Sequence, residues 1–533
     1  MRIPHFLLLL FFVVLSANWA LAEDSTLIAG LASSDSNEKI AALDQLANES
    51  PEKALSVLQA LANNTLYLAD GRLIIEEKNS YQDALSGEQL AQTPENLDGI
   101  VVNNRVRKHV ASALAALNLL SSDNRVRLHA AENLAKAADA HNLPLILTAL
   151  QKEQNKDILA LLQVARDKAS LQSPDALVRK QAVLELAKNP TPATRQLLMG
   201  LLEKRGESWA ETDSEVRSAA EYSLHIIEGK LRIGENLNRI FTGISLGSIL
   251  LLAAMGLAVT YGVMGVINMA HGELLMIGAY ATYSVQVLFN TYLPQWANWY
   301  LLAALPCGFL AAAITGMVLE RLVIRHLYGR PLETLLATWG LSLILIQAVR
   351  TLFGAQNVAV ANPLWMAGSV TLMPNLILPW NRIIIIGFSM AVLAGMWAIL
   401  NLTRLGLFVR AVTQNRSMSS CVGVATGKID TLAFGLGAGI AGLGGVALSQ
   451  VSNVGPDMGQ GYIVDSFMVV VLGGVGQLAG TVWAALGLGI ISKFFEVWSG
   501  AVIAKIAVLV IVIVVIQKRP QGLFALKGRT VES

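Results

Sequence analysis

Apolar and polar residues alternate differently in the two halves of the chain. Up to about Glu235, apolar positions recur at helical spacing and charged residues fill the positions between them. From Phe241 onward, long apolar runs follow one another with only short polar breaks. The first pattern is typical of helices in water and the second of helices in a lipid bilayer. We therefore expect a helical domain over residues 23–235 and a membrane domain over 236–533, which together make an all-α protein.

Four segments of the first half share the pattern Asp/Asn-x-x-Val-Arg. We expect the Asp or Asn to cap a helix, the Val to join a buried stripe, and the Arg to bridge to an acidic residue of the next helix. The segments are Asn103–Arg107, Asp123–Arg127, Asp175–Arg179 and Asp213–Arg217. This arrangement resembles HEAT-like helical repeats, whose helix pairs bury their faces only by stacking on neighbours. Protein interaction is the usual use of such a stack.

Two smaller features of this half carry separate predictions. Thr65–Ile75 reads as two short strands around an Asp70-Gly71 turn, which predicts a β-hairpin inserted among the helices. The histidines are scattered without metal-ligand spacing, so we expect them on solvated helix faces and expect neither a metal site nor a catalytic residue. They are His109, His129, His141 and His225.

The N-terminus has the pattern of a secretory signal peptide over residues 1–22. Arg2 supplies the positive end, Phe6–Leu15 is a short apolar core, and Ala20-Leu21-Ala22 is an A-x-A-type cleavage site. The core is too short for a helix that spans roughly 30 Å of hydrocarbon, although an uncleaved anchor remains the alternative. Either version exports the domain that follows. That domain contains no cysteine, because the only two, Cys307 and Cys421, lie in the second half.

The apolar runs of the second half predict about nine membrane spans. They are 241–264, 272–290, 299–320, 334–353, 382–401, 430–452, 464–480, 481–498 and 501–517. Glycines interrupt the seventh and eighth, so either can be a half-helix or a re-entrant segment. Small residues four positions apart, such as Gly435 and Gly439, indicate close helix packing.

Basic residues predict the orientation of these spans. Lys and Arg gather in the breaks Arg321–Arg330 and Arg404–Lys428 and in the tail from Lys518, while the other breaks have almost none. The positive-inside rule makes the basic breaks and the C-terminus cytoplasmic. An exported N-terminal domain then requires an odd number of crossings, as nine is. The net charge of +2 gives no indication of nucleic-acid binding.

The stretch Gly265–Tyr280 carries Asn268, His271 and Glu273 between two apolar runs. Polar groups at membrane depth usually face a bundle interior or a water-filled path. One interpretation is a substrate path, with Asn268 and His271 on one helix face unless Gly272 breaks the helix there. The other is structural: His271 and Glu273 pair with each other, or with a neighbouring loop, at the cytoplasmic end of the first span.

Enzyme motifs are incomplete in this chain. Gly243–Gly247 matches G-x-S-x-G but lies in an apolar helix rather than at a strand-to-helix turn. Ser245 with His271 would imitate the dyad of an intramembrane serine protease, which is the enzyme alternative. Gly423–Lys428 falls one residue short of a P-loop and is followed by Ile429. If ATP drives this protein, another chain must bind it.

Three stretches carry a family resemblance. Gly265–Tyr280, Val471–Gly480 and Lys518–Phe524 resemble the permease subunits of branched-chain amino acid-type ABC importers. With its exported repeat domain, the chain is similar to the urea ABC transporter permease. That resemblance implies an inner-membrane permease for urea with a second permease chain, two ATP-binding subunits and a periplasmic solute-binding protein. Import of branched-chain amino acids or short amides is one alternative, and a membrane-anchored scaffold for exported proteins is another.

The longest basic break is the expected contact with the ATP-binding subunits. Gly406–Val412 predicts a short amphipathic helix, and the whole break resembles the coupling helix of the family, which docks in a cleft of that subunit. The alternative is an ordinary basic loop that follows membrane topology. The candidate coupling residues are Arg404, Arg410, Asn415, Arg416 and Gly423.

Overall fold

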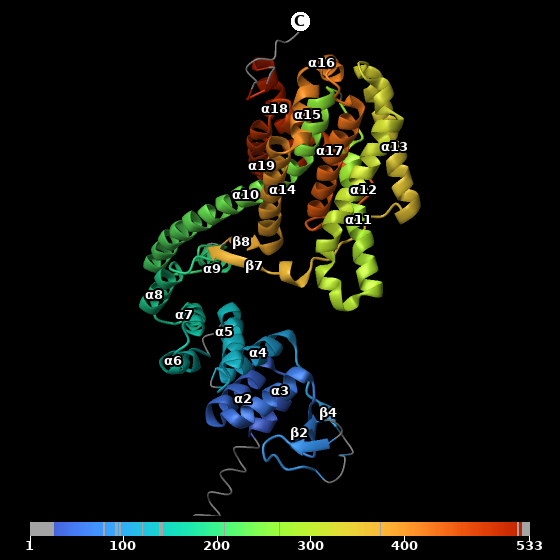
Figure 1. Ribbon diagram of the computed structural model, residues 1–533. Helices are drawn as coiled ribbons and strands as arrows, with labels where there is room; N and C mark the ends of the chain where they lie inside the picture. Colours follow the sequence, from blue (N-terminus) through green and yellow to red (C-terminus); the bar gives the residue numbers. More distant parts are fainter. Residues whose placement is uncertain are drawn as a thin grey trace, which may run out of the picture. The chain divides into compact units, whose positions relative to one another are not determined.

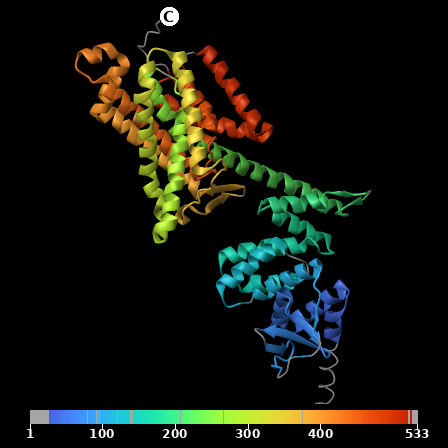
Figure 2. The same ribbon diagram turned by 90° about the vertical axis from the view of Figure 1, so that its right-hand side faces the viewer.

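The computed structural model describes residues 26–77, 80–90, 94, 97–119, 121–137, 142–206, 208–265, 267–373, 375–519 and 522–524 (Figures 1 and 2). The chain divides into two compact units between Leu231 and Arg232. This division falls close to the predicted domain boundary, and each unit is described by itself. The predicted signal peptide lies outside the described residues.

The N-terminal unit is built mainly from short helices, several of which begin at a side-chain cap. Asn103 accepts a hydrogen bond from the Val106 backbone N–H at 2.9 Å, and Asp175 accepts one from the Leu177 N–H at 2.9 Å. Asp123 and Asp213 cap their helices in the same way, as the pattern predicts. The helices are α2 (Ser36–Glu49), α3 (Pro51–Asn63), α4 (Asn104–Asn118), α5 (Asn124–Ala137), α6 (Leu143–Lys152), α7 (Lys156–Ser170), α8 (Ala176–Leu186), α9 (Pro192–Leu201) and the first part of α10 (Ser214–Met264).

The predicted valine stripe is only half right. Val106 and Val216 are buried, with 2% and 0% of their surface exposed, but Val126 and Val178 are each 38% exposed. In α5 the buried positions are instead Ala130, Ala131 and Leu134. The face that packs is therefore rotated away from the valine in α5 and α8.

Two of the four arginines bridge to an acidic residue, but in neither case does that residue lie within the next helix, as was predicted. Arg127 pairs with Glu153 at 2.8 Å, and Arg179 pairs with Glu211 at 2.8 Å. Glu153 is the residue that ends α6, and Glu211 precedes α10. Arg217 instead donates to the carbonyl oxygens of Glu211 and Thr212 at 2.9 and 2.7 Å. These guanidinium groups connect the ends of helices to the loops between them.

The predicted hairpin is confirmed and is part of a larger sheet. Strands β1 (Leu66–Ala69) and β2 (Arg72–Glu77) pair antiparallel across a turn in which Asp70 and Gly71 have φ of 50° and 74°. Two strands that the sequence did not predict complete the sheet, in the order β3-β2-β1-β4. They are β3 (Ser80–Asp83) and β4 (Asp98–Gly99); a separate pair is formed by β5 (Lys204–Arg205) and β6 (Ser208–Trp209).

One histidine of this unit contradicts its predicted position. His109 is only 6% exposed, and its Nε2 lies 2.8 Å from Oδ1 of Asp44 on α2. It follows Val106 by three positions, which places it on the buried face of α4. His129 and His225 are exposed, as expected, and His141 lies outside the described residues.

The C-terminal unit contains the helices that suit a membrane. By length and composition, six helical segments of the described chain are able to cross one: α10, α12 with the short helix η2 before it, α13, α14, α17 and α19. The bounds of the helices are α11 (His271–Tyr292), η2 (Pro294–Trp299), α12 (Tyr300–Leu322), η3 (Ile324–Leu327), α13 (Pro331–Phe353), η4 (Leu364–Met366), α14 (Trp380–Leu402), α15 (Arg404–Gln414), α16 (Arg416–Cys421), α17 (Thr426–Ser449), α18 (Met458–Gly473) and α19 (Leu478–Lys518). A hairpin of β7 (Ser369–Met373) and β8 (Leu376–Pro379) precedes α14. The predicted class, a largely helical polytopic membrane protein, is confirmed.

The seventh predicted span differs from the helix that the structure contains there, whereas the last two agree with it. The predicted end of the span 464–480 is wrong. Helix α18 stops at Gly473, and the following Gly474 and Gly476 adopt φ of 97° and 77°. The last two predicted spans are the arms of α19, which is broken by non-helical Gly500. Besides the six, α11 has 22 residues and α18 is a shorter apolar helix of 16. The number of crossings stays a prediction.

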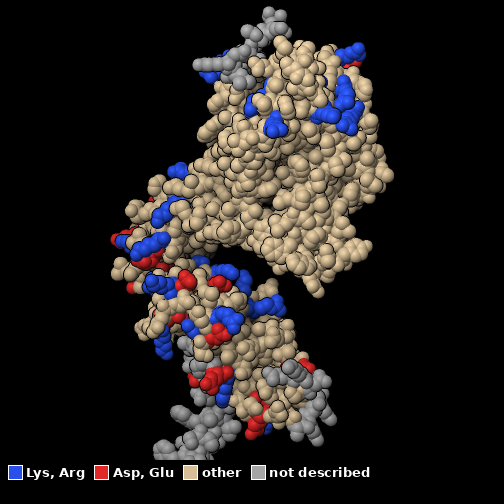
Figure 3. Space-filling model, in the orientation of Figure 1, with Lys and Arg blue, Asp and Glu red and all other residues tan. Residues whose placement is uncertain are grey.

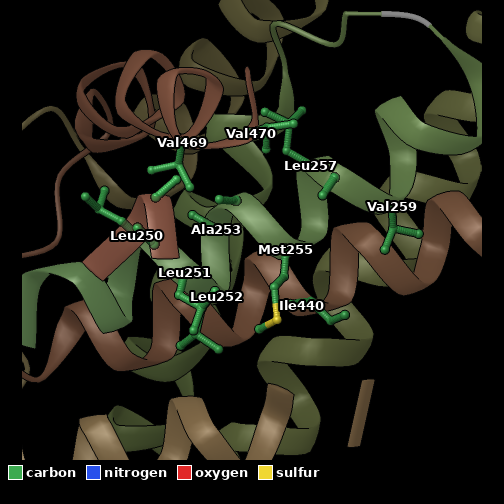
Figure 4. Packing of buried hydrophobic residues seen from close by; sticks show 14 of the residues in the cluster. Leu250, Leu251, Leu252, Ala253, Met255, Leu257, Val259, Ile440, Val469 and Val470 are labelled. Atoms are coloured by element: carbon green, nitrogen blue, oxygen red, sulfur yellow. The ribbon is translucent and has the colours of Figure 1, made fainter. Parts of the chain in front are cut away.

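The core of this unit is assembled around α10, α11, α12, α17 and α18. Figure 4 shows part of its largest apolar cluster, in which side chains of α10 meet Ile440 of α17 and Val469 and Val470 of α18. Helices also approach backbone to backbone at glycines. A Cβ at Gly278 of α11 would overlap the Gly442 carbonyl oxygen of α17. The predicted small-residue packing therefore involves direct contact between main chains.

Candidate functional site

The polar stretch begins where α10 ends. Gly265 has φ of 66° and turns the chain after Met264, and α11 starts at His271. Asn268 therefore lies in the connection before the helix, so the expectation that it shares a helix face with His271 is wrong. Gly272 does not break the helix either. It lies in the first turn of α11, where a Cβ would overlap the Gly459 carbonyl oxygen of α18.

His271 is held deep in the bundle. Its side chain is buried, and Nε2 lies 2.9 Å from the carbonyl oxygen of Ala253. Ala253 precedes the end of α10 by about three helical turns. The connection after α10 therefore returns into the bundle, and the shallow, solvent-accessible position expected in the structural interpretation is wrong.

Glu273 contacts a different helix. Its Oε1 accepts a hydrogen bond from the Ser342 hydroxyl of α13 at 2.8 Å, and a Cβ at Gly459 of α18 would lie 2.7 Å from Oε2. The predicted pairing of His271 with Glu273 is not formed, because the two side chains turn to α10 and α13 respectively. Each residue joins α11 to a neighbouring helix.

Asn268 and the residue after it complete the site. The Asn268 Oδ1 accepts from the Ala270 N–H at 3.0 Å, and the Met269 N–H donates to the Thr338 hydroxyl of α13 at 3.1 Å. Several buried polar atoms here have no hydrogen-bond partner among the described residues. They are Asn268 Nδ2, His271 Nδ1, Glu273 Oε2 and Tyr280 Oη. Asn268, Glu273 and His271 thus offer an amide donor, a carboxylate oxygen and an imidazole nitrogen, whereas Tyr280 lies about two helical turns further along α11.

Sequence reasoning missed the contribution of α13. Its buried Thr334, Thr338 and Ser342 recur every four positions and therefore share one helix face. This hydroxyl-bearing face contacts the stretch at Met269 and Glu273. The signal was present in the sequence as three small hydroxyl residues at helical spacing in an otherwise apolar run.

The serine–histidine dyad of the enzyme alternative is not assembled. Ser245 is buried in α10. It lies roughly two helical turns before Ala253, whose carbonyl oxygen is hydrogen-bonded to the His271 ring. A hydrolase would need the hydroxyl and the imidazole within hydrogen-bond reach. In the described part of the chain, no group of three His, Cys, Asp or Glu side chains is arranged to hold a metal ion.

The candidate coupling residues lie on two short helices. The predicted amphipathic helix is α15, which begins at the exposed Arg404 and ends at Gln414. Asn415 caps α16 by accepting from the Met418 N–H at 2.9 Å, and Gly423 turns the chain with φ of 89°. Arg410 donates to the Leu400 carbonyl oxygen of α14.

Arg416 is tied to the bundle rather than free. Its guanidinium pairs with the fully buried Asp430 of α17 and lies 4.6 Å from the ring centre of Tyr328. Beside this pair, the fully buried Glu320 of α12 accepts from the Thr431 hydroxyl at 2.7 Å and contacts Arg325 at 3.4 Å. The sequence did not predict this ion-pair cluster, since Glu320 and Asp430 are single acids at the ends of apolar runs.

Lys and Arg surround this region. In Figure 3, blue side chains gather at the end of the C-terminal unit where α15 and α16 lie, and the surface over α11 and α12 shows no charged side chain in that view. Several apolar side chains are also exposed on the two helices. They are Leu407, Phe408, Met418 and Val422.

Comparison with known proteins identifies the C-terminal unit. Residues 239–517 match the family model described as "Branched-chain amino acid transport system / permease component". Over 296 residues, the chain is 29% identical to the high-affinity branched-chain amino acid transport system permease protein LivH of Salmonella typhimurium, covering 54% of this chain and 94% of that protein.

Two more distant relatives are also described as transport permeases. The chain is 27% identical over 293 residues to BraD of Pseudomonas aeruginosa, a protein described in the same way, covering 54% and 95% of the two chains. It is 26% identical over 311 residues to the ribose import permease protein RbsC of Escherichia coli, covering 51% and 85%. No solved structure was found to match. Since the family model covers more than half of the 533 residues, this chain belongs to the family of branched-chain amino acid-type ABC transport permeases.

Proposed function

We propose that this chain is the transmembrane permease subunit of an ABC importer for urea. The family match of residues 239–517 is the observation that carries the permease assignment. The alignment with LivH takes in 94% of that protein but only 54% of this chain, so this chain has a large N-terminal unit beyond the relative. An exported repeat unit of that kind is the feature by which the sequence resembles urea permeases.

The substrate requires its own experiment, because the relatives carry names for branched-chain amino acids and for ribose. The complete transporter should be reconstituted in liposomes with its solute-binding protein and supplied with ATP. We expect ATP-dependent uptake of labelled urea and none of labelled leucine. If the transporter takes up leucine but not urea, branched-chain amino acids replace urea as the proposed substrate, and the permease assignment is unaffected.

The buried polar atoms of the candidate site support a path for a polar, uncharged solute. Urea carries two NH2 donors and one carbonyl acceptor. Asn268 Nδ2 is able to donate to the carbonyl, and Glu273 Oε2 and His271 Nδ1 are able to accept from the NH2 groups. Buried polar atoms without partners are costly, so groups of this kind favour exchange of hydrogen bonds with a passing solute.

The path is tested with Asn268→Ala and His271→Ala. Loss of urea uptake with normal insertion, assembly and basal ATPase activity is the expected result. Thr282→Val is the matched control, because its hydroxyl is buried on the same helix but bonds only the Gly278 carbonyl oxygen of that helix. Loss of the assembled complex in both variants would give these residues a structural role. Unchanged uptake would remove them from the path.

We propose that α15 and α16 form the contact with the two ATP-binding subunits. Arg410 and Arg416 are occupied within this chain, so substituting them would disturb the fold as well as the contact. Met418 is 62% exposed on α16 and gives a cleaner probe. Met418→Glu should reduce substrate-stimulated ATP hydrolysis, with Met418→Leu as the control. Equal coupling in both variants would return the segment to an ordinary basic loop.

We propose that the N-terminal unit is periplasmic, that the C-terminus is cytoplasmic, and that the chain lies in the inner membrane beside a second permease chain. The grouping of Lys and Arg around α15 and α16 supports this orientation. A reporter fused near Gly229 should be active in the periplasm, and one fused after Lys527 in the cytoplasm. Activity of both reporters on one side would reject an odd number of crossings.

A further inference from the structure

A second polar site lies in the C-terminal unit, and no residue of Gly265–Tyr280 is among those that line it. A cavity of about 260 Å³ is enclosed by α10, α18 and both arms of α19. Its walls are apolar except for Tyr462, Ser492 and four charged side chains. The charged residues are Asp465, Lys493, Glu496 and Lys505.

The position of these charges in the fold is unusual. Glu496 and Lys505 lie on the two arms of α19, each roughly 6–8 Å along the helix axis from the break at Gly500. Asp465 lies in the middle of α18. All of them belong to apolar helices. Ionisable groups in such segments are expensive against lipid and therefore mark a solute path or a protein contact.

The charges are paired but accessible. Lys505 Nζ lies 3.2 Å from Asp465 Oδ2 and donates to the Gly461 carbonyl oxygen at 3.3 Å. Lys493 Nζ donates to Glu496 Oε2 at 2.6 Å. The Lys505 side chain remains 59% exposed and that of Glu496 40% exposed. Two carboxylates and two ammonium groups thus line a pocket that is neutral overall.

We propose that this cavity, lined by Asp465, Glu496, Lys493 and Lys505, is a binding site for a small neutral amide on the transport path. A carboxylate only accepts hydrogen bonds and an ammonium only donates them, so a pocket with both is complementary to the NH2 groups and the carbonyl of urea. A neutral solute is able to bridge the two kinds of group while the existing ion pairs persist. A zwitterionic amino acid would instead compete with those pairs for the same charges.

This inference rests on the proposed urea transport and is tested in the complete reconstituted transporter. Asp465→Asn and Lys505→Gln should each raise the KM for urea by about tenfold, the effect of losing one charged hydrogen bond, while assembly and basal ATPase activity stay normal. Lys518→Gln is the matched control, since this lysine ends the same helix but does not line the cavity. Its KM should equal that of the wild type.

A labelling experiment measures binding without transport. In a background with Cys307 and Cys421 replaced by serine, Ser492→Cys should be labelled by a thiol reagent more slowly when millimolar urea is present. Ser499→Cys lies outside the cavity lining and should show no protection.

The outcomes separate the two proposals. If the wild type moves no urea, the proposed function fails. If the wild type moves urea but the variants keep its KM and Ser492→Cys gains no protection, only the second site is rejected. Loss of the assembled complex in Asp465→Asn and Lys505→Gln, with no urea protection, would make the cluster a contact between subunits and also overturn the binding site.

Discussion

The helices of the N-terminal unit pack through side chains, whereas several helices of the C-terminal unit meet through their backbones. In the first unit, fully buried Leu134, Ile146 and Leu162 fill the space between helices. In the second, Gly278 faces Gly442 with no room for a Cβ. Burial of apolar side chains drives packing in water, but it gives little advantage in lipid, where close contact between surfaces takes its place.

Charged residues show the same contrast. In the N-terminal unit, pairs such as Arg179–Glu211 recur along the chain and connect helix ends to loops. In the described part of the C-terminal unit, charged residues lie at a few separate places, such as Glu273, the Arg350–Asp457 pair, the Arg416–Asp430 cluster and the cavity of Asp465 and Lys505. A charge in water has many structural uses, whereas a charge at membrane depth needs a functional reason. The rarity of charges in the second unit is what makes their positions informative.

The largest effect is expected at the backbone contacts. Gly278→Leu should abolish assembly of the C-terminal unit, because the side chain would displace the main chain of α17 and overpacking alone costs at least about 1–3 kcal/mol. The yield of folded protein in size-exclusion chromatography measures this. Gly487→Leu is the control, since in the described part of the chain no neighbouring helix comes within 4 Å of a Cβ there. Equal yields from the two variants would contradict backbone packing.

A smaller effect is expected when an ion pair of the N-terminal unit is broken. The Glu211 side chain is 5% exposed, so Arg179→Met would leave a buried carboxylate unpaired and destabilise the surroundings of α8 by up to about 3–5 kcal/mol. Native-state hydrogen exchange of α8 in the full chain measures this. The neighbouring Lys180 pairs with the exposed Glu215, and Lys180→Met should cost much less, because water screens that pair. Similar losses in the two variants would show that burial does not decide the strength of these pairs.

The same pairs predict a dependence on pH. The hydrogen bonds from Arg127 and Arg179 hold the pKa values of Glu153 and Glu211 below the usual range. A carboxyl whose pKa is lowered by folding stabilises the native state above its unfolded pKa of about 4.3, and this stability is lost as the pH falls through the lower folded value. The protection factors of the α8 amides, which remove the intrinsic pH dependence of exchange, should therefore fall below about pH 4.

A counterexample in the same unit sharpens this test. Burial raises the pKa of Asp167 on α7, so protonation of that carboxyl favours the folded state as the pH falls. Arg179→Met should flatten the pH dependence at α8 and leave that of α7 unchanged. If the pH dependence at α8 is the same in Arg179→Met as in the wild type, groups other than Glu211 cause it.

Local rules predicted much of the fold. The caps at Asn103 and Asp175, the turn at Asp70-Gly71 and most apolar spans depend on residues close together in sequence, and the structure has them where expected. That Arg127 and Arg179 form ion pairs was also expected, although their partners lie at a helix end and in a loop rather than within the next helix.

Contacts between distant segments were not predictable. Asn268 precedes α11 because the chain returns into the bundle after Gly265, and the partner of Glu273 is Ser342, which lies 69 positions away. His109 is buried because Asp44 of another helix faces it. In each case, the polar residue is evident in the sequence, but its interaction partner on another helix is not.

The smallest predicted effect concerns two valines that the repeat pattern treats as equivalent. Val106 is 2% exposed, so Val106→Ala should destabilise α4 by about 1–2 kcal/mol through lost apolar burial. Val126 is 38% exposed, and alanine is the better helix former, so Val126→Ala should leave α5 unchanged or slightly more stable. Hydrogen exchange of the two helices in the full chain compares them directly. Equal losses would mean that the repeats bury the same face after all, and that the rotation of α5 is not a property of the protein in solution.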